Sequence, residues 1–293
     1  MIHRRTFLKQ SGLALAATTL LPNTIFANSS NQPLGLQLYS LRETIGNDVK
    51  GTIQKLAEIG FKEAETYGYS KDNGFWGLSV EEFKNILEQN GIKTPSGHYG
   101  IDPFLEKDGT KDELNYILEV ANKLDQEYVI APYIADNLRN SVDDYKRIAD
   151  KLNTAGEMCK KEGLKFAYHN HAFEFDDYDG ENGYKIFLEN TDKDLVYFEM
   201  DIYWVVRAGI EPAELFKKYP GRFPLWHVKD MDKQQPELNT EIGSGAVDYK
   251  EIFKYTEEAG AKHLIIEQEN FEMEPYQSLE QSFDYLQNKL VTK

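Results

Sequence analysis

The chain has 293 residues, a formal net charge of −16 and a single cysteine. This acidic balance argues against a nucleic-acid partner, because binding a phosphate backbone requires a basic surface, and one cysteine can form neither an internal disulfide nor a cysteine-based zinc site. A hydrophobic share of 41%, with 13% aromatic residues, is typical of a folded globular chain rather than a disordered acidic one.

The first predicted element is an export signal over residues 1–27. Arg4 and Arg5 open the string RRTFLK, which resembles the twin-arginine export signal, and an apolar run over residues 12–21 follows. That run is too short to span a bilayer comfortably, and the small residue Ala27 stands at a plausible cleavage point. We therefore expect a periplasmic or extracellular protein without stable membrane insertion. The competing interpretations are a membrane-anchoring helix and a general secretory signal.

The rest of the chain repeats one pattern after a polar linker at residues 28–33. A short apolar run, a loop and an amphipathic stretch recur through residues 34–293, which we interpret as one catalytic domain. Eight apolar runs are predicted strands, at residues 34–40, 62–68, 92–98, 127–133, 164–171, 195–201, 223–229 and 263–269. The predicted helices lie at residues 47–59, 79–90, 110–124, 141–162, 183–190, 211–219, 248–259 and 275–290.

Local signals mark where these helices begin and end. Ser79 with Glu82 fits the capping box that starts a helix, and Ser141 is a second predicted N-cap. Four predicted helices run into a glycine, which suits the left-handed backbone that ends a helix: Gly60, Gly91, Gly163 and Gly260. Eight strand–helix units in about 260 residues predict a (β/α)8 TIM barrel, an α/β fold. A doubly wound open sheet is the alternative, but no glycine-rich phosphate loop follows the first strand.

Side chains of the metal-ligand type gather at the carboxyl ends of the predicted strands. They are His98 on the third strand; His169, Asn170 and His171 on the fifth, with Glu174 just beyond; Asp201 on the sixth; His227, Lys229 and Asp230 on the seventh; and Glu267 and Glu269 on the eighth. Such side chains cost free energy in a buried strand unless they are paired or used. The carboxyl end is where barrel enzymes place their chemistry. Carboxylates with an imidazole suit a divalent cation such as Mn²⁺, Mg²⁺, Co²⁺ or Zn²⁺.

Each of these residues also has a plain structural explanation. A lone histidine on a strand is more often a hydrogen-bonded core residue, and Asp201 could cap the loop that follows it. Lys229 and Asp230 could form an ordinary ion pair, and the nearby aromatic residues could simply belong to the core. The functional interpretation depends on four strands taken together, because each of strands five to eight carries a residue of the metal-ligand type at its carboxyl end.

Five segments, taken in their order and spacing, carry a family resemblance. They are YHNHAFEF (168–175), FEMDIYWVVRAG (198–209), WHVKDM (226–231), IGSGAVDYKEIF (242–253) and LIIEQEN (264–270). Through them residues 34–290 resemble the xylose-isomerase-like barrel superfamily, and within it the sugar phosphate isomerases/epimerases. The resemblance implies a divalent metal held by Glu, Asp, His and Glu from strands five to eight. Asp201, His227 and Glu267 match the last three of these ligands.

The first ligand departs from the family pattern. The best-matching position on strand five is His169, and the nearest carboxylate is Glu174. We therefore assign Glu174 as the fourth ligand, with His169 as its competitor. The departure argues against the two-glutamate proton shuttle of the ketose 3-epimerases, and it leaves His169 or His171 as a candidate base.

The resemblance implies a metal-dependent isomerase or epimerase of sugars or keto-sugars, with Mn²⁺ as the expected ion. The metal would stabilise an enediolate formed when a base removes the proton alpha to a carbonyl. A lyase or dehydratase acting on a 3-keto-glycoside or an inosose shares that intermediate and is the alternative. His169 or His171 is the first candidate base and Glu269 the second, while Lys229 would hold or polarise a substrate oxygen.

The predicted substrate contacts are His98, Asn170, Trp204, Tyr67 and Trp76. The acidity of the chain favours a neutral sugar over a sugar phosphate. Two further readings stay open: a metal-dependent nuclease, which shares this barrel but needs a cationic groove, and a non-catalytic exported sugar-binding module, which needs no metal. Relatives are often dimers or tetramers, so a homo-oligomer is compatible with the resemblance.

Overall fold

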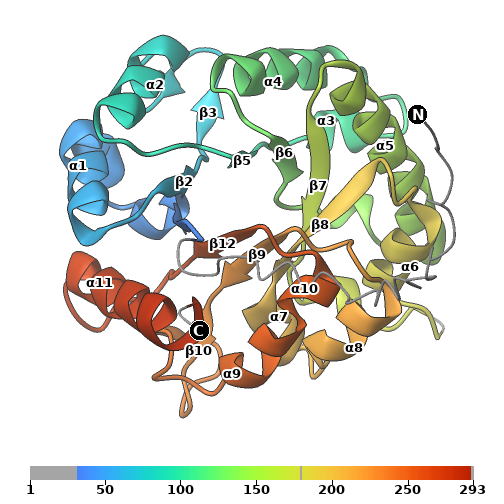
Figure 1. The fold of residues 1–293 in the computed structure, drawn as a ribbon. Coiled ribbons are helices and arrows are strands. Elements are labelled where there is room, and N and C mark those ends of the chain that lie inside the picture. The colour runs from blue at the N-terminus through green and yellow to red at the C-terminus, as the bar shows by residue number, and fades with distance from the viewer. Residues whose placement is uncertain (1–31, 179, 292–293) are drawn as a thin grey trace, which may run out of the picture.

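The computed structural model describes residues 32–178 and 180–291. The eight barrel strands are β1 (Leu34–Gln37), β2 (Glu63–Glu65), β5 (Ser96–His98), β6 (Tyr128–Ala131), β7 (Lys165–His169), β8 (Val196–Asp201), β9 (Leu225–Val228) and β12 (His263–Ile266). They form one parallel sheet in the order β2-β1-β12-β9-β8-β7-β6-β5, with the helices in a ring around it (Figure 1). The predicted export signal, residues 1–27, lies outside the described residues, as does most of the predicted linker.

The two ends of that order, β2 and β5, meet through a thin join. Glu63 pairs with Lys93 and Thr66 with Gly97 as isolated parallel bridges. The amide of His98 donates a hydrogen bond to the carbonyl of Thr66 at 2.7 Å. The strands therefore curl into a barrel, as the eight-unit pattern predicts, and not into an open doubly wound sheet.

Each predicted helical segment contains helix. The helices are α1 (Val49–Ile59), α2 (Val80–Gln89), α4 (Asp112–Lys123), α5 (Val142–Lys161), α6 (Gly183–Asn190), α8 (Pro212–Lys218), α9 (Tyr249–Ile252), α10 (Thr256–Ala259) and α11 (Pro275–Tyr285). A 3-10 turn separates α9 from α10, and a π-helical segment, Leu286–Val291, follows α11. The short helices α3 (Asp102–Leu105) and α7 (Ile202–Arg207) were not predicted. Two small antiparallel pairs lie outside the barrel sheet, β3 (Tyr69–Ser70) with β4 (Gly74–Phe75) and β10 (Asp230–Met231) with β11 (Asn239–Thr240). Short 3-10 turns lie at Leu38–Leu41, Ile45–Asn47, Asp136–Leu138 and Phe173–Phe175.

The predicted helix signals are confirmed. The amide of Glu82 donates to Ser79 Oγ at 3.2 Å and the amide of Ser79 donates to the Glu82 carboxylate at 2.9 Å, which is a complete capping box. Ser141 Oγ accepts from the amide of Asp144 at 3.2 Å. The four glycines expected to end helices all have positive φ: 124° at Gly60, 66° at Gly91, 78° at Gly163 and 77° at Gly260.

Alternation along the strands places an apolar layer beneath a polar one. The buried residues Tyr128, Ile130, Ala167, Leu225 and Ile265 form a small cluster separate from the main core. Since residues two apart share a face of a strand, His169, His227 and Glu267 follow Ala167, Leu225 and Ile265 on the same face. The polar side chains therefore lie one layer closer to the carboxyl end of the barrel.

Two other features bear on the predictions from sequence. Cys159 in α5 is buried, and burial raises the pKa of its thiol to about 12, so this thiol is unreactive. Within residues 32–178 and 180–291, none of the helices combines the length and apolar character needed to cross a bilayer.

Candidate active site

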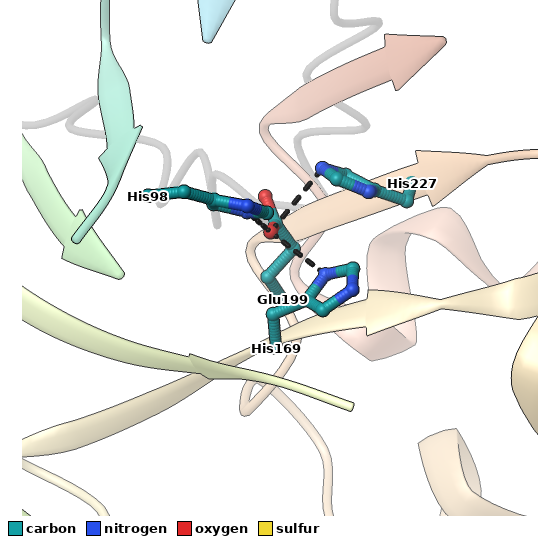
Figure 2. Close-up of side chains that lie close together, drawn as sticks. All are labelled: His98, His169, Glu199 and His227. Atoms are coloured by element: carbon teal, nitrogen blue, oxygen red, sulfur yellow. Dashed lines mark hydrogen bonds and ion pairs between the residues drawn. The ribbon is translucent and has the colours of Figure 1, made fainter. Parts of the chain in front are cut away.

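Three histidines from three strands converge on the carboxylate of Glu199 in β8 (Figure 2). Glu199 Oε2 lies 2.7 Å from His98 Nε2 and 3.0 Å from His169 Nδ1. The same oxygen lies 3.2 Å from His227 Nε2. Glu199 is fully buried, so these contacts lie in the interior of the barrel.

A second buried carboxylate, that of Glu65 at the end of β2, contacts two of these three rings. Glu65 Oε1 lies 2.9 Å from His98 Nε2 and 2.8 Å from His227 Nε2. Gln37 Nε2 and Ser96 Oγ donate to the Glu65 carboxylate at 2.6 Å and 2.5 Å. Side chains from three other strands, β1, β5 and β9, thus fix one carboxylate of β2.

The carboxylates and imidazoles of this network shift one another's pKa values. Burial alone would raise the pKa of Glu65, but His98 and His227 bring it well below its ordinary value. Burial would lower the pKa of His98, yet Glu65 and Glu199 raise it to about 9. His98 is therefore an imidazolium held between two buried carboxylates.

Asp201, His227 and Glu267 form a group able to hold a divalent cation. One ligand atom from each lies within 4.8 Å of the others, and His227 Nδ1 is 3.1 Å from Glu267 Oε2. Asp201 Oδ1 accepts the amide of Trp204 at 3.2 Å, whereas the buried Oδ2 has no hydrogen-bond partner among the described residues. Burial raises the pKa of Asp201 to about 7 against the opposing effect of Lys229. A buried carboxylate oxygen that accepts no hydrogen bond, with the ammonium of Lys229 at 3.6 Å, fits a bound cation.

His169 stands beside this group on the strand-five side. Its Nε2 is 4.0 Å from Asp201 Oδ2, while its Nδ1 is held by Glu199. Burial lowers the pKa of His169 well below its ordinary value, and His227 and His98 lower it further. His169 is therefore a neutral imidazole, which is the form that ligates a metal, with its other nitrogen oriented by a carboxylate.

Glu174 does not reach the group. Its buried carboxylate accepts hydrogen bonds from the Tyr168 hydroxyl at 2.6 Å and from the amide of His171 at 2.9 Å. Tyr168 alternates with His169 on β7 and packs against Phe187 of α6 in the helix layer, with ring centroids 5.0 Å apart. The turn after β7 thus aims Glu174 away from the barrel interior. The structure corrects the expectation that Glu174 completes the metal group, and it offers His169 in that place.

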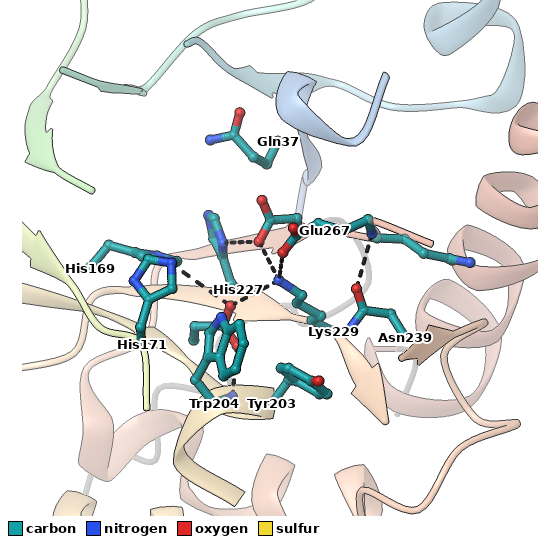
Figure 3. A network of polar contacts seen from close by, with 12 residues as sticks. Gln37, His169, His171, Tyr203, Trp204, His227, Lys229, Asn239 and Glu267 are labelled. Carbon is teal, nitrogen blue, oxygen red and sulfur yellow. Dashed lines mark hydrogen bonds and ion pairs between the residues drawn. The ribbon is translucent and has the colours of Figure 1, made fainter. Parts of the chain in front are cut away.

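Lys229 lies among the carboxylates of this site (Figure 3). Its Nζ is 3.1 Å from Glu267 Oε2 and 3.6 Å from Asp201 Oδ2, and it also contacts the carboxylate of Glu269. Burial would lower the pKa of Lys229, but Glu267, Asp201 and Glu269 together raise it above its ordinary value. The buried side chain is therefore a charged ammonium. The expected partner Asp230 instead accepts backbone amides of the loop at Gly243, Gly245 and Val247.

A cavity of about 440 Å³ opens over this network. His98, His169, His171, Glu267 and Glu269 are among its lining residues. Burial, with a contribution from Lys229, lowers the pKa of His171 to about 3. Its Nδ1 is buried without a hydrogen-bond partner in the described structure, so a neutral nitrogen is left free for a ligand.

The predicted substrate contacts divide into two sets. His98 and Tyr67 line the cavity. Trp76 packs behind Tyr67, with ring centroids 5.3 Å apart, and does not line it. Asn170 is buried, and its Oδ1 accepts a hydrogen bond from the backbone amide of Asp201 at 3.1 Å. Trp204 packs against His171 at 5.5 Å and lies 5.5 Å from Lys229 Nζ (Figure 3).

Sequence reasoning missed Gln37, Glu65 and Glu199. A signal was present, because Glu199 lies two residues before Asp201 on one strand, so both side chains share its inner face. Glu65 likewise lies two residues after Glu63 in a strand that is buried throughout. Buried glutamates at such positions require partners, and histidines on facing strands supply them.

Comparison with known proteins agrees with this architecture. Residues 53–289 match the family of xylose isomerase-like TIM barrels, and the chain belongs to that family. It is 28% identical over 263 residues to an inosose dehydratase of Clostridium perfringens, covering 76% of this chain and 83% of the relative. An inosose dehydratase of Clostridium beijerinckii is 25% identical over 284 residues, covering 83% and 90%. A solved sugar phosphate isomerase/epimerase of Parabacteroides distasonis superposes with a TM-score of 0.78 at 28% identity, over 90% of this chain and 100% of that one.

Proposed function

We propose that this protein is a divalent-metal-dependent lyase that removes water, or another β-leaving group, from a keto-sugar or an inosose. The observation that carries this proposal is the buried ammonium of Lys229, held beside a cation-binding group and in contact with Glu269, which lines the cavity. Elimination needs a group that stabilises the departing oxygen as well as a base, and an ammonium in this place can stabilise that oxygen by a hydrogen bond. The inosose dehydratases among the relatives support the same choice.

The chain offers four side chains to the metal. Asp201, His227, Glu267 and His169 would hold it, which the Asp201 oxygen without a hydrogen bond and the neutral His169 ring support. Burial lowers the pKa of His227, but Glu199, Glu267 and Glu65 raise it well above its ordinary value, so this ring would give up a proton to the metal. Imidazole with carboxylate oxygens suits Mn²⁺ first among the borderline and hard cations, and also Mg²⁺, Co²⁺ or Zn²⁺. When bound, the metal would supply Lewis-acid stabilisation of the negative charge that develops on the substrate carbonyl oxygen.

The acid–base groups lie on either side of that position. His171 Nδ1, neutral and unpaired, takes the proton from the carbon alpha to the carbonyl, with Glu269 as the second candidate base. Lys229 donates to the oxygen that leaves from the neighbouring carbon. The C–H and C–O bonds break, and the proton that His171 has taken passes to the departing hydroxyl, which leaves as water.

Isomerisation or epimerisation of a keto-sugar is the second candidate. One feature favours it: His171 follows β7 and Glu269 follows β12, so two candidate bases stand on separate strands around the cavity. Returning a proton to the opposite face of an enediolate requires two such groups. The similarity to a solved sugar phosphate isomerase/epimerase points the same way.

Reaction in deuterated water separates these outcomes. We expect the Mn²⁺-loaded protein, incubated with inosose and a panel of keto-sugars, to give a product lighter by one water. Product mass by mass spectrometry and carbon-bound deuterium by NMR are the measurements. Deuterium uptake with an unchanged formula would replace the lyase with an isomerase or epimerase. Sugar binding without exchange or mass change would show a non-catalytic binding module.

We also propose that residues 1–27 export the folded protein by the twin-arginine route. Replacing Arg4 and Arg5 together by Lys is expected to leave the protein in the cytoplasm, because that route reads the arginine pair itself. Cell fractionation with immunodetection measures the distribution, and Lys9→Arg is the matched charge-preserving control. Undiminished export of the double variant would eliminate this route.

A further inference from the structure

Two exposed tyrosines stand where the candidate active site opens to solvent. Among the described residues, the large apolar side chains that remain exposed are Tyr39, at 39%, Tyr133, at 40%, and Met273, at 40%. Tyr39 and Tyr133 both line the cavity that also contains His171 and Glu267. Exposed aromatic rings beside the candidate catalytic residues of a cavity are typical of a site where a ligand covers the rings.

Tyr39 is fixed from three directions. Its ring meets Tyr67 edge-on at 5.1 Å, and its amide donates to Gln37 Oε1 at 2.9 Å. The guanidinium of Arg42 lies 4.7 Å from the ring centroid. Arg42 is itself anchored, because it donates to the carbonyl of Glu269 at 3.0 Å. The ring is therefore positioned before any ligand arrives.

Tyr133 is fixed in the same manner. Its hydroxyl donates to Asp136 at 2.7 Å and accepts from Arg139 at 3.2 Å. Its ring meets His171 edge-on at 5.5 Å and Phe173 at 5.4 Å. A ring held this way loses little conformational entropy when a ligand packs on it.

The cavity disfavours an anionic ligand group where Tyr39 and Tyr133 lie, and the imidazolium of His98, which also lines it, is already paired with Glu65 and Glu199. The described residues that line it include no lysine or arginine, and they include Glu113, Glu267 and Glu269. The two nearby guanidinium groups, Arg42 and Arg139, are engaged with the tyrosines and with backbone carbonyls. A phosphate would thus meet carboxylates and aromatic rings without a free cation.

We infer that Tyr39 and Tyr133 form a second subsite, which binds an uncharged ring attached to the reacting keto-sugar. The preferred substrate is then a glycoside rather than a sugar phosphate. A cavity of about 440 Å³ lies within the range that buries drug-sized ligands, about 300–1,000 Å³. A sugar ring or an aryl group offers the flat apolar face that packs on tyrosine. This inference rests on the proposed function, since it places the reacting ring over the metal group.

Binding of non-reacting glycosides tests the subsite without requiring turnover. The full-length protein is titrated with methyl, phenyl and glucosyl β-glucosides in isothermal titration calorimetry. Glucose 6-phosphate is the anionic probe. We expect phenyl or glucosyl glucoside to bind about tenfold more tightly than methyl glucoside. Tyr39→Ala and Tyr133→Ala should each remove most of that gain, and Tyr39→Phe should keep it. Comparison of the phenyl and glucosyl ligands identifies which ring the subsite prefers.

Tyr255→Ala provides the control, because Tyr255 is a half-buried tyrosine with Lys217 at 4.7 Å from its ring and does not line the cavity. Melting temperatures of all variants verify folding. Equal affinity for the methyl and ring-bearing glycosides, or a gain that survives both alanine variants, would overturn the subsite, as would tighter binding of glucose 6-phosphate. Failure of the lyase assay alongside a tyrosine-dependent gain would instead count against the proposed reaction.

Discussion

Replacement of Asp201 by alanine is expected to abolish divalent-metal binding and turnover while the barrel stays folded. Asp201 supplies the unpaired oxygen at the cation group, and His227 and Glu267 alone leave that position incomplete. We expect metal affinity to fall by more than about 100-fold, since even residues that only orient metal ligands contribute about 10–100-fold. Metal content by mass spectrometry after dialysis, and Mn²⁺ titration, measure the loss. Glu267→Ala should behave in the same way.

Two matched variants make this prediction specific. Asp201 also caps α7 through the amide of Trp204, so the alanine variant loses about 1 kcal/mol of stability for a reason unrelated to metal. Asp201→Asn can keep that cap and should still lose the metal. Glu174→Gln should retain it, because Glu174 faces Tyr168 and the amide of His171. Wild-type affinity in Asp201→Ala would refute the assignment, and a wild type that takes up no divalent metal would refute the site.

Lys229→Met is expected to destabilise the metal-free protein and, at the same time, to tighten metal binding. The ammonium neutralises Glu267, Asp201 and Glu269 in a buried site, and removal of one partner from such a buried cluster costs about 3–5 kcal/mol. The same ammonium repels a cation, since it lies 3.1 Å from a candidate ligand oxygen. Turnover should be lost, because the departing oxygen loses its proposed hydrogen-bond donor.

Denaturant unfolding with a chelator, followed by Mn²⁺ titration, measures both effects. The metal should raise the melting temperature more in the variant than in the wild type, because a tighter ligand stabilises the folded state more. Lys193→Met is the control, since Lys193 pairs with Asp194 on the exposed surface, where ion pairs contribute little to stability. Unchanged stability without metal, or weaker metal binding, would show that Lys229 does not neutralise the site.

The fold was predictable because its signals are local and repeated. Period-two burial, amphipathic helices and caps such as Ser79 each specify their own element, and eight repeats of one unit leave few architectures. The break between α9 and α10 was not predictable, since the apolar pattern runs through residues 248–259 without a proline or glycine inside the break. Short helices such as α7 follow strands directly and carry too few residues for a periodic signal.

The metal group was predictable in part. Asp201, His227 and Glu267 occupy the ends of their strands, where sequence position determines the direction of the side chain. Glu174 lies beyond β7, and once a chain leaves a strand its spacing no longer tells which way a residue points. The orienting carboxylates Glu65 and Glu199 required knowledge of which strands face one another across the barrel, which a single sequence does not contain.

The thin join between β2 and β5 has a consequence for how this barrel opens. Isolated bridges connect the two strands, and His98 crosses the same join to reach Glu65 on one side and Glu199 on the other. Backbone hydrogen bonds span the same join as these ion pairs, from Lys93 to Lys62, from Ala64 to Lys93, from Thr66 to Ser96 and from His98 to Thr66. Fluctuations that separate β2 from β5 must break those ion pairs, and fluctuations that scatter the histidines loosen the join. Opening of the barrel wall and disassembly of the reactive centre are therefore a single cooperative event.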